Sequence, residues 1–275
     1  MPRARSNGIE LEYDVSGRPD GVPLLLVGGL GTQLVSWDEG FCELLAAHGF
    51  RVIRFDNRDA GLSTWPEEEY TLDDMAADTV GLLDALGIRA AHVVGASMGG
   101  FIAQLVALKH PDRVLSLTSM ISGPNGADQV RPTPEAQALL LAPVPPTHEE
   151  RVQLALTSKR TLLGPGDPYD EAYERAKAVR AIDRAYHPAG FARQLRAIVA
   201  APSRLERLRS LRLPVLVVHG DADILVPVDN GRRVAAAVPG ARWLEIPGMG
   251  HDVPRRVWPQ VVDAIAAIAG VSAVR

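Results

Sequence analysis

Hydrophobic and polar positions alternate along the chain in short blocks that predict strands and helices in turn. Polar and apolar residues alternate over 9–15, as in a half-buried edge strand, whereas the unbroken apolar run 24–27 is typical of a strand buried on both faces. The same criteria predict further strands at 51–55, 91–94, 114–120, 215–218 and 242–246. Apolar residues at helical spacing predict helices at 38–48, 71–86, 98–109, 228–237 and 257–269. This order predicts an α/β fold with a mostly parallel central sheet flanked by helices.

The alternation of strands and helices stops in the middle of the chain and resumes later. Between 124 and 202 no strand-like run occurs. Prolines crowd the stretch 132–146, where we expect a loop, and helical spacing follows at 149–163, 170–186 and 189–200. We therefore expect residues 124–202 to form a helical cap, or lid, inserted into a core made of residues 1–123 and 203–275.

Composition and charge exclude several classes of protein. The chain has 275 residues, of which 47% are hydrophobic, and a net charge of −4, which excludes disordered and fibrous chains and provides no basic surface for nucleic acid. The single cysteine, Cys42, excludes a disulfide framework and a cysteine-rich zinc site. The basic residues 1–8 precede no long apolar segment, and no apolar run is long enough to span a bilayer. We therefore expect a cytoplasmic protein without a membrane span.

The sequence Gly95-Ala96-Ser97-Met98-Gly99 matches the pattern G-x-S-x-G between a predicted strand and a predicted helix. A serine on such a tight turn stands above the edge of the sheet, and Gly95 and Gly99 are needed because side chains there would collide. Backbone N–H groups at the start of the helix point towards developing negative charge. We predict Ser97 as a nucleophile. The competing interpretation, a glycine-rich turn with an incidental serine, is disfavoured by the flanking elements.

A serine hydroxyl needs a base, and in this pattern the acid and then the histidine follow the serine along the chain. His251, in a glycine-rich loop after the last predicted strand, is the predicted base; the other histidines are expected to cap, to pack or to lie on the surface. Asp223 and Asp221 compete as the acid. We favour Asp223, just past a strand, and expect Asp221 to hold the turn. Asp252 is excluded because adjacent side chains point in opposite directions.

A second glycine-rich loop, 28–31, follows the strand predicted at 24–27. We expect the backbone N–H of Leu30 to join that of Met98 in an oxyanion hole. A dinucleotide-binding interpretation of this loop fails, because Leu34 stands where the third glycine is required. The chain also lacks a P-loop and a H-E-x-x-H metal motif, so we expect no cofactor and no metal.

With these motifs the chain resembles the α/β-hydrolase superfamily over essentially its full length, and most closely the serine esterase branch that contains aclacinomycin methylesterase and related actinobacterial esterases. Many members carry His-Gly where this chain has Gly28-Gly29. The resemblance implies an α/β-hydrolase fold with a helical cap insert. The matching segments are 28–31, 92–99, 245–251, and 52–63 with its pattern Asp56-x-Arg58-Asp59-x-Gly61-x-Ser63.

The function expected is hydrolysis of a carboxylic ester through a Ser-His-Asp triad and an acyl-enzyme. A C–C bond hydrolase, a lactonase and a cofactor-free haloperoxidase or perhydrolase share the triad, and a ligand receptor without turnover is the alternative of another class. Dehalogenases and epoxide hydrolases of this fold use an aspartate where this chain has Ser97.

The substrate is expected to be a small ester. Leucines of the segment 124–202 favour either an apolar acyl or polyketide-like substrate or, equally, simple packing on the core; they are Leu139–Leu141, Leu154, Leu156, Leu162 and Leu163. A monomer and a homodimer are both compatible with the sequence.

Overall fold

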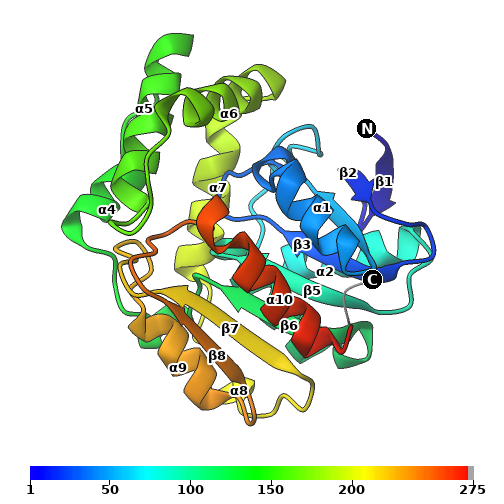
Figure 1. Cartoon of the computed structure of the whole chain (residues 1–275). Helices are drawn as coiled ribbons and strands as arrows, with labels where there is room; N and C mark the ends of the chain where they lie inside the picture. The colour runs from blue at the N-terminus through cyan, green and yellow to red at the C-terminus, as the bar shows by residue number, and fades with distance from the viewer. Residues whose placement is uncertain (272–275) are drawn as a thin grey trace.

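The computed structural model describes residues 1–271, and within them eight strands form one sheet in the order β1-β2-β4-β3-β5-β6-β7-β8 (Figure 1). Strand β2 runs antiparallel to β1 and β4, and every other neighbouring pair is parallel. The mostly parallel sheet is thus confirmed. The strands are β1 Arg3–Ser6, β2 Ile9–Ser16, β3 Val22–Val27, β4 Phe50–Phe55, β5 Ala91–Ala96, β6 Val114–Met120, β7 Val215–Gly220 and β8 Arg242–Ile246.

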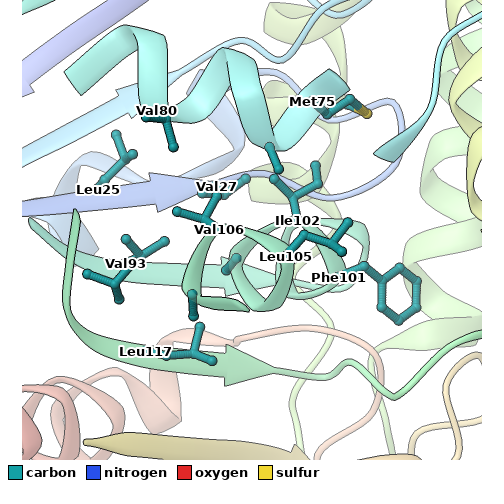
Figure 2. Packing of buried hydrophobic residues seen from close by; sticks show 14 of the residues in the cluster. Leu25, Val27, Met75, Val80, Val93, Phe101, Ile102, Leu105, Val106 and Leu117 are labelled. Atoms are coloured by element: carbon teal, nitrogen blue, oxygen red, sulfur yellow. The ribbon is translucent and has the colours of Figure 1, made fainter. Parts of the chain in front are cut away.

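Helices cover both faces of this sheet. Helices α1 (Glu39–Ala47) and α10 (Trp258–Ala269) lie on the near face in Figure 1. On the other face lie α2 (Leu72–Ala85), α3 (Met98–Lys109), α8 (Leu205–Leu208) and α9 (Asp229–Ala237). Side chains of α2 and α3 pack on β3, β5 and β6 (Figure 2). Alternate residues of β3 enter the two cores, Leu25 and Val27 on one face and Leu24 and Leu26 on the other, which explains its unbroken apolar run.

The edge of the sheet differs from the sequence-based expectation. Strand β2 is not an edge strand, because β1 pairs outside it with Ala4 opposite Leu11. The hairpin turns at Asn7-Gly8, where φ is +47° and +82°. Asn-Gly is a preferred pair for such turns, so a local signal for β1 was present in the sequence.

Four helices follow β6 and precede α8 and β7: α4 (Pro134–Leu140), α5 (His148–Leu162), α6 (Glu171–Arg184) and α7 (Pro188–Ala200). We call residues 124–202 the helical segment. Helix α4 was not predicted, because its prolines suggested a loop; Pro134 in fact occupies the first turn, where proline is tolerated, and the Thr133 side chain caps the helix. No helix within residues 1–271 is long and apolar enough to cross a membrane.

The two ends of the helical segment lie next to each other. The Arg204 N–H donates to the Pro124 carbonyl over 2.9 Å, and the Asn125 side chain donates to the Ile198 carbonyl over 2.9 Å. The segment therefore leaves and re-enters the sheet region at one place, between β6 and β7.

The helical segment is attached to the loop that follows β4. The Arg193 guanidinium makes two 2.8 Å hydrogen bonds to the carboxylate of Asp59, whose side chain is fully buried. Arg184 pairs with the equally buried Asp56 over 2.7 Å. Buried charge pairs of this kind favour a single position and orientation of α6 and α7 on the core.

A third buried ion pair fixes the same loop to α2. The Arg58 guanidinium contacts both carboxylate oxygens of Asp78 at 2.6 and 2.7 Å, and both side chains are at least nine-tenths buried. We expect Arg58→Met to reduce the free energy of unfolding by about 3–5 kcal/mol, because Asp78 is left buried and uncompensated. Urea unfolding measures the change.

The double variant Arg58→Met/Asp78→Leu should recover most of that loss, since no buried charge remains. Arg18→Met, in a solvent-exposed pair with Asp20, should leave the urea midpoint unchanged. A midpoint for Arg58→Met equal to that of the wild type would contradict the prediction.

Candidate active site

Ser97 stands on the tight turn between β5 and α3. Its backbone has φ +55° and ψ −120°, a conformation that L residues rarely adopt. A Cβ atom on Gly95 would lie 2.1 Å from the Gly99 carbonyl oxygen, and one on Gly99 would lie 2.0 Å from the Val27 carbonyl oxygen. Both glycines are therefore needed because backbone approaches them, not because two side chains would collide as the sequence suggested.

The structure brings Ser97, His251 and Asp223 together from three separate loops. His251 lies between β8 and α10, and Asp223 follows β7. The Ser97 Oγ and His251 Nε2 atoms are 2.9 Å apart, and His251 Nδ1 lies 2.7 Å from Asp223 Oδ2. Since a carboxylate only accepts hydrogen bonds, Nδ1 carries the proton and Nε2 accepts from the serine hydroxyl.

The carboxylate of Asp223 is held inside the protein by three hydrogen-bond donors and lies close to a second imidazole. Its Oδ1 accepts from the backbone N–H groups of Leu225 and Val226 at 2.9 and 2.8 Å. Its Oδ2 faces His251 and, at 3.4 Å, His219. Burial opposes ionisation of Asp223, but the two imidazoles outweigh it and hold the pKa of Asp223 below its ordinary value.

His219 was expected only to pack inside a strand, and its contact with Asp223 was missed. Its side chain is fully buried in β7, and its Nε2–H donates to the Val226 carbonyl over 2.7 Å. Within the described residues, its Nδ1 has no hydrogen-bond partner. The sequence did contain a signal, because Asp223 follows His219 by four residues. A turn directly after the strand can bring the aspartate back beside the histidine.

The two rejected carboxylates have other partners. Asp221 Oδ1 accepts from the Gly248 N–H at 2.7 Å, so it ties the turn after β7 to the loop that carries His251. Asp252 Oδ2 accepts from Lys159 Nζ at 2.6 Å. Neither carboxylate therefore occupies the position beside His251 Nδ1 that Asp223 holds.

Of the two residues predicted to form the oxyanion hole, Met98 directly follows Ser97 in the chain and Leu30 lies in loop 28–31. A Cβ atom on Gly29 would lie 3.4 Å from Ser97 Cβ, so loop 28–31 passes directly beside the serine. Within residues 1–271, neither N–H donates to a backbone or side-chain acceptor. Two unpaired donors beside a serine hydroxyl are suited to bind an oxygen that becomes negatively charged.

Loop 28–31, which begins with Gly28, is braced by side chains from two parts of the molecule. The Asn57 side chain donates to the Gly28 carbonyl over 3.1 Å, and the Thr32 hydroxyl donates to the Gly29 carbonyl over 3.0 Å. The Gly31 N–H donates to the Gln194 side chain of α7 over 2.7 Å. Contacts from the core and from the helical segment thus fix this loop.

A cavity of about 1120 Å³ lies above Ser97 and beneath the helical segment. Of the leucines singled out in the sequence, Leu139–Leu141, Leu162 and Leu163 line it. Leu154 and Leu156 are not among its lining residues, and Leu156 is buried within the segment. Five of the seven leucines therefore line the cavity, Leu156 packs within the segment, and Leu154 is half-buried.

One side of the cavity carries charged groups. Lys159 pairs with Asp252 at 2.6 Å and with Glu174 at 3.5 Å. Burial, together with the positive charge of Lys159, lowers the pKa of Lys177, whose Nζ lies 4.0 Å from Asp38. The lining of the cavity thus combines apolar side chains with charged groups that donate and accept hydrogen bonds.

Comparison with known proteins identifies the family to which this fold belongs. The family model described as the alpha/beta hydrolase fold matches residues 22–254. Rhodomycin D methylesterase DauP of Streptomyces sp. (strain C5) is 35% identical over 276 residues, covering 91% of this chain and 92% of the methylesterase. The crystal structure of the enol-lactonase from Burkholderia xenovorans LB400 superposes with a TM-score of 0.79 at 26% identity, covering 98% of this chain and 100% of the lactonase.

The structure of CumD, a meta-cleavage product hydrolase from Pseudomonas fluorescens IP01, shares the fold. It superposes with a TM-score of 0.82 at 22% identity, and the match covers 98% of this chain and 97% of the CumD chain. The resemblance drawn from the sequence motifs is confirmed by the family model and by the methylesterase. This chain belongs to the α/β-hydrolase family.

Proposed function

We propose that this hydrolase cleaves carboxylic esters, with Ser97 as nucleophile, His251 as base and Asp223 as the acid that orients it. The observation that carries the proposal is the continuous hydrogen-bonded chain from Asp223 through His251 to Ser97 Oγ, which opens into the cavity. The similarity to rhodomycin D methylesterase DauP supports ester cleavage.

In the first half of the reaction the Ser97 oxygen attacks the ester carbonyl while His251 Nε2 takes the hydroxyl proton. The carbonyl oxygen becomes negatively charged and accepts hydrogen bonds from the N–H groups of Leu30 and Met98. Asp223 keeps the proton on Nδ1 and stabilises the imidazolium. His251 then gives its proton to the leaving alcohol, and the acyl group stays on Ser97.

In the second half, water attacks the acyl-enzyme and His251 takes a proton from that water. The same two N–H groups bind the oxyanion again, and collapse of the intermediate returns the proton to Ser97 and releases the carboxylic acid. Asp223 does not change its protonation state at any step, in keeping with its lowered pKa.

We propose that the helical segment is a lid, separate from a core made of residues 1–123 and 203–275, and that it selects the substrate. The leucines and the charged groups that line the cavity suit a bulky ester with an extended apolar body and some oxygen substituents, as in a polyketide-like compound. The volume of about 1120 Å³ leaves ample room for a ligand of drug size.

Replacing the nucleophile gives the first test. We expect Ser97→Ala to lower kcat for a p-nitrophenyl short-chain ester by at least about 10⁴-fold, because no acyl-enzyme forms. Release of p-nitrophenolate measures the rate, and mass spectrometry after treatment with a fluorophosphonate shows whether Ser97 is labelled in the wild type. An unchanged rate in Ser97→Ala would refute the assignment.

Replacing the acid separates the two neighbouring aspartates. Asp223→Asn should lower kcat by about 10⁴-fold, because the amide no longer orients and stabilises the protonated imidazole. Asp221→Asn is the matched control: its amide oxygen still accepts from the Gly248 N–H, so we expect kcat within about threefold of wild type. If Asp221→Asn had the larger effect, the roles of the two aspartates would have to be exchanged.

A substrate panel tests the ester preference and the size of the acyl group. We expect kcat/KM to rise from acetyl to longer and bulkier apolar acyl esters, because each added group contacts the apolar wall of the cavity. Lactones and vinylogous diketones, the substrates of a lactonase or a C–C bond hydrolase, should react more slowly. A strict preference for acetyl esters would contradict a roomy apolar pocket, and faster lactone opening would identify a lactonase.

A further inference from the structure

The loop that carries His251 is bonded to the helical segment through its backbone. The His251 N–H donates to the Leu162 carbonyl over 2.7 Å, and the Gly250 N–H donates to the Leu163 carbonyl over 3.0 Å. A third bond, 2.9 Å long, joins the Gly166 N–H to the Gly248 carbonyl. Leu162 is the last residue of α5, so its carbonyl has no partner inside the helix and is available to accept from outside.

These bonds require four glycines, at 164, 166, 248 and 250, which we call the glycine contact. A Cβ atom on Gly250 would lie 2.1 Å from the Leu162 carbonyl oxygen, and one on Gly164 would lie 2.3 Å from the Gly250 nitrogen. A Cβ atom on Gly166 would lie 2.9 Å from Gly248 Cα. A side chain on any of these three residues would therefore force the two backbones apart.

Ion pairs flank the glycine contact on both sides. Lys159 of α5 pairs with Asp252, the residue after His251, over 2.6 Å. Asp167, just beyond the contact, accepts from Arg256 over 2.7 Å, and its side chain is fully buried. Backbone bonds and charged side chains thus hold the same two segments, 159–167 and 248–256, together.

The core holds this loop mainly at its beginning. Asp221 accepts from the Gly248 N–H, and the Met249 N–H donates to the Ile246 carbonyl over 3.3 Å. The next two N–H groups, those of Gly250 and His251, both donate to the helical segment. The main chain of the loop that carries His251 is therefore held by the helical segment as well as by the core.

We propose that the end of α5 positions the catalytic histidine: the carbonyls of Leu162 and Leu163 hold the main chain of His251 so that its imidazole stays aligned between Asp223 and Ser97. The inference rests on the proposed function, because it concerns the alignment of the proposed base. The helical segment then contributes to the chemical step as well as to substrate binding. A displacement of about 1 Å in a reacting group can cost about 10²-fold in rate.

A segment that only binds substrate would affect KM and bulky esters, whereas a segment that positions His251 would affect every reaction of Ser97. The compact phosphate triester diethyl p-nitrophenyl phosphate separates the two. The Ser97 oxygen attacks phosphorus, p-nitrophenolate leaves, the serine proton passes to His251, and a diethylphosphoryl serine remains. This reagent is small compared with the cavity, so its binding depends little on the lid.

The test compares two glycine-to-alanine variants with positive φ. Gly164→Ala (φ +91°) inserts a Cβ atom into the glycine contact, whereas Gly240→Ala (φ +74°) has no atom within 4 Å of the added carbon. Both variants strain the backbone, but only Gly164→Ala separates the two segments. We expect Gly164→Ala to be phosphorylated about 10-fold to 100-fold more slowly than wild type and Gly240→Ala to react within about twofold of it.

The outcomes separate the inference from the proposed function. A wild type that reacts at a residue other than Ser97, or not at all, overturns the proposed function. A wild type labelled at Ser97 together with an equally fast, folded Gly164→Ala overturns the positioning role alone. Thermal unfolding shows whether Gly164→Ala is folded.

If Gly164→Ala does not fold, the decisive variant is Gly166→Ala. Its added carbon lies 2.9 Å from Gly248 Cα, the mildest of the three clashes, and its φ is not in the positive region. We expect about threefold to tenfold slower labelling of Ser97. A labelling rate equal to that of wild type in folded Gly166→Ala overturns the positioning role.

Discussion

The carboxylate of Asp223 is a fully buried negative charge, and the geometry of the site depends on the groups that compensate it. Two imidazoles and two backbone N–H groups replace its hydration shell, and they come from β7, from the turn after β7 and from the loop after β8. Because β7 and β8 are neighbouring parallel strands, the segments that follow them begin side by side at the carboxyl ends of the strands. One buried charge therefore fixes two loops and the orientation of His251.

Ser97 reaches this arrangement from β5, with β6 between it and β7. Its strained backbone is held by the end of β6, since the Ser97 N–H donates to the Met120 carbonyl over 3.0 Å and the Ser122 hydroxyl donates to the Ser97 carbonyl over 2.8 Å. A residue in such a conformation costs on the order of 1–3 kcal/mol and persists only where its surroundings determine it. The strain keeps the hydroxyl above the sheet, within reach of the His251 imidazole, whose loop follows β8, three strands away.

The parts of this molecule that were predictable from sequence are those encoded within a short stretch. Strands such as β3 are buried on both faces and therefore appear as unbroken apolar runs, and the serine motif places its residue at a strand–helix junction whatever the rest of the fold. The local signals for β1 and α4, Asn7-Gly8 and Thr133-Pro134, were also present, but Asn7-Gly8 was not interpreted as a hairpin turn and the prolines of 132–146 suggested a loop. Both elements were missed because of the interpretation and not for lack of information.

The glycine contact was not predictable, because it depends on two segments that meet only in the folded chain. Glycine shows this most clearly, since one residue type serves two physical needs. Gly240 has a positive φ in open space, Gly250 has an ordinary φ but no room for a side chain, and Gly164 combines both constraints. A sequence pattern records the glycine but not the atom that approaches it. The contact between the helical segment and the His251 loop therefore depends on glycines, because they have no side chain to keep the two backbones apart. Hydrophobic periodicity cannot detect such positions.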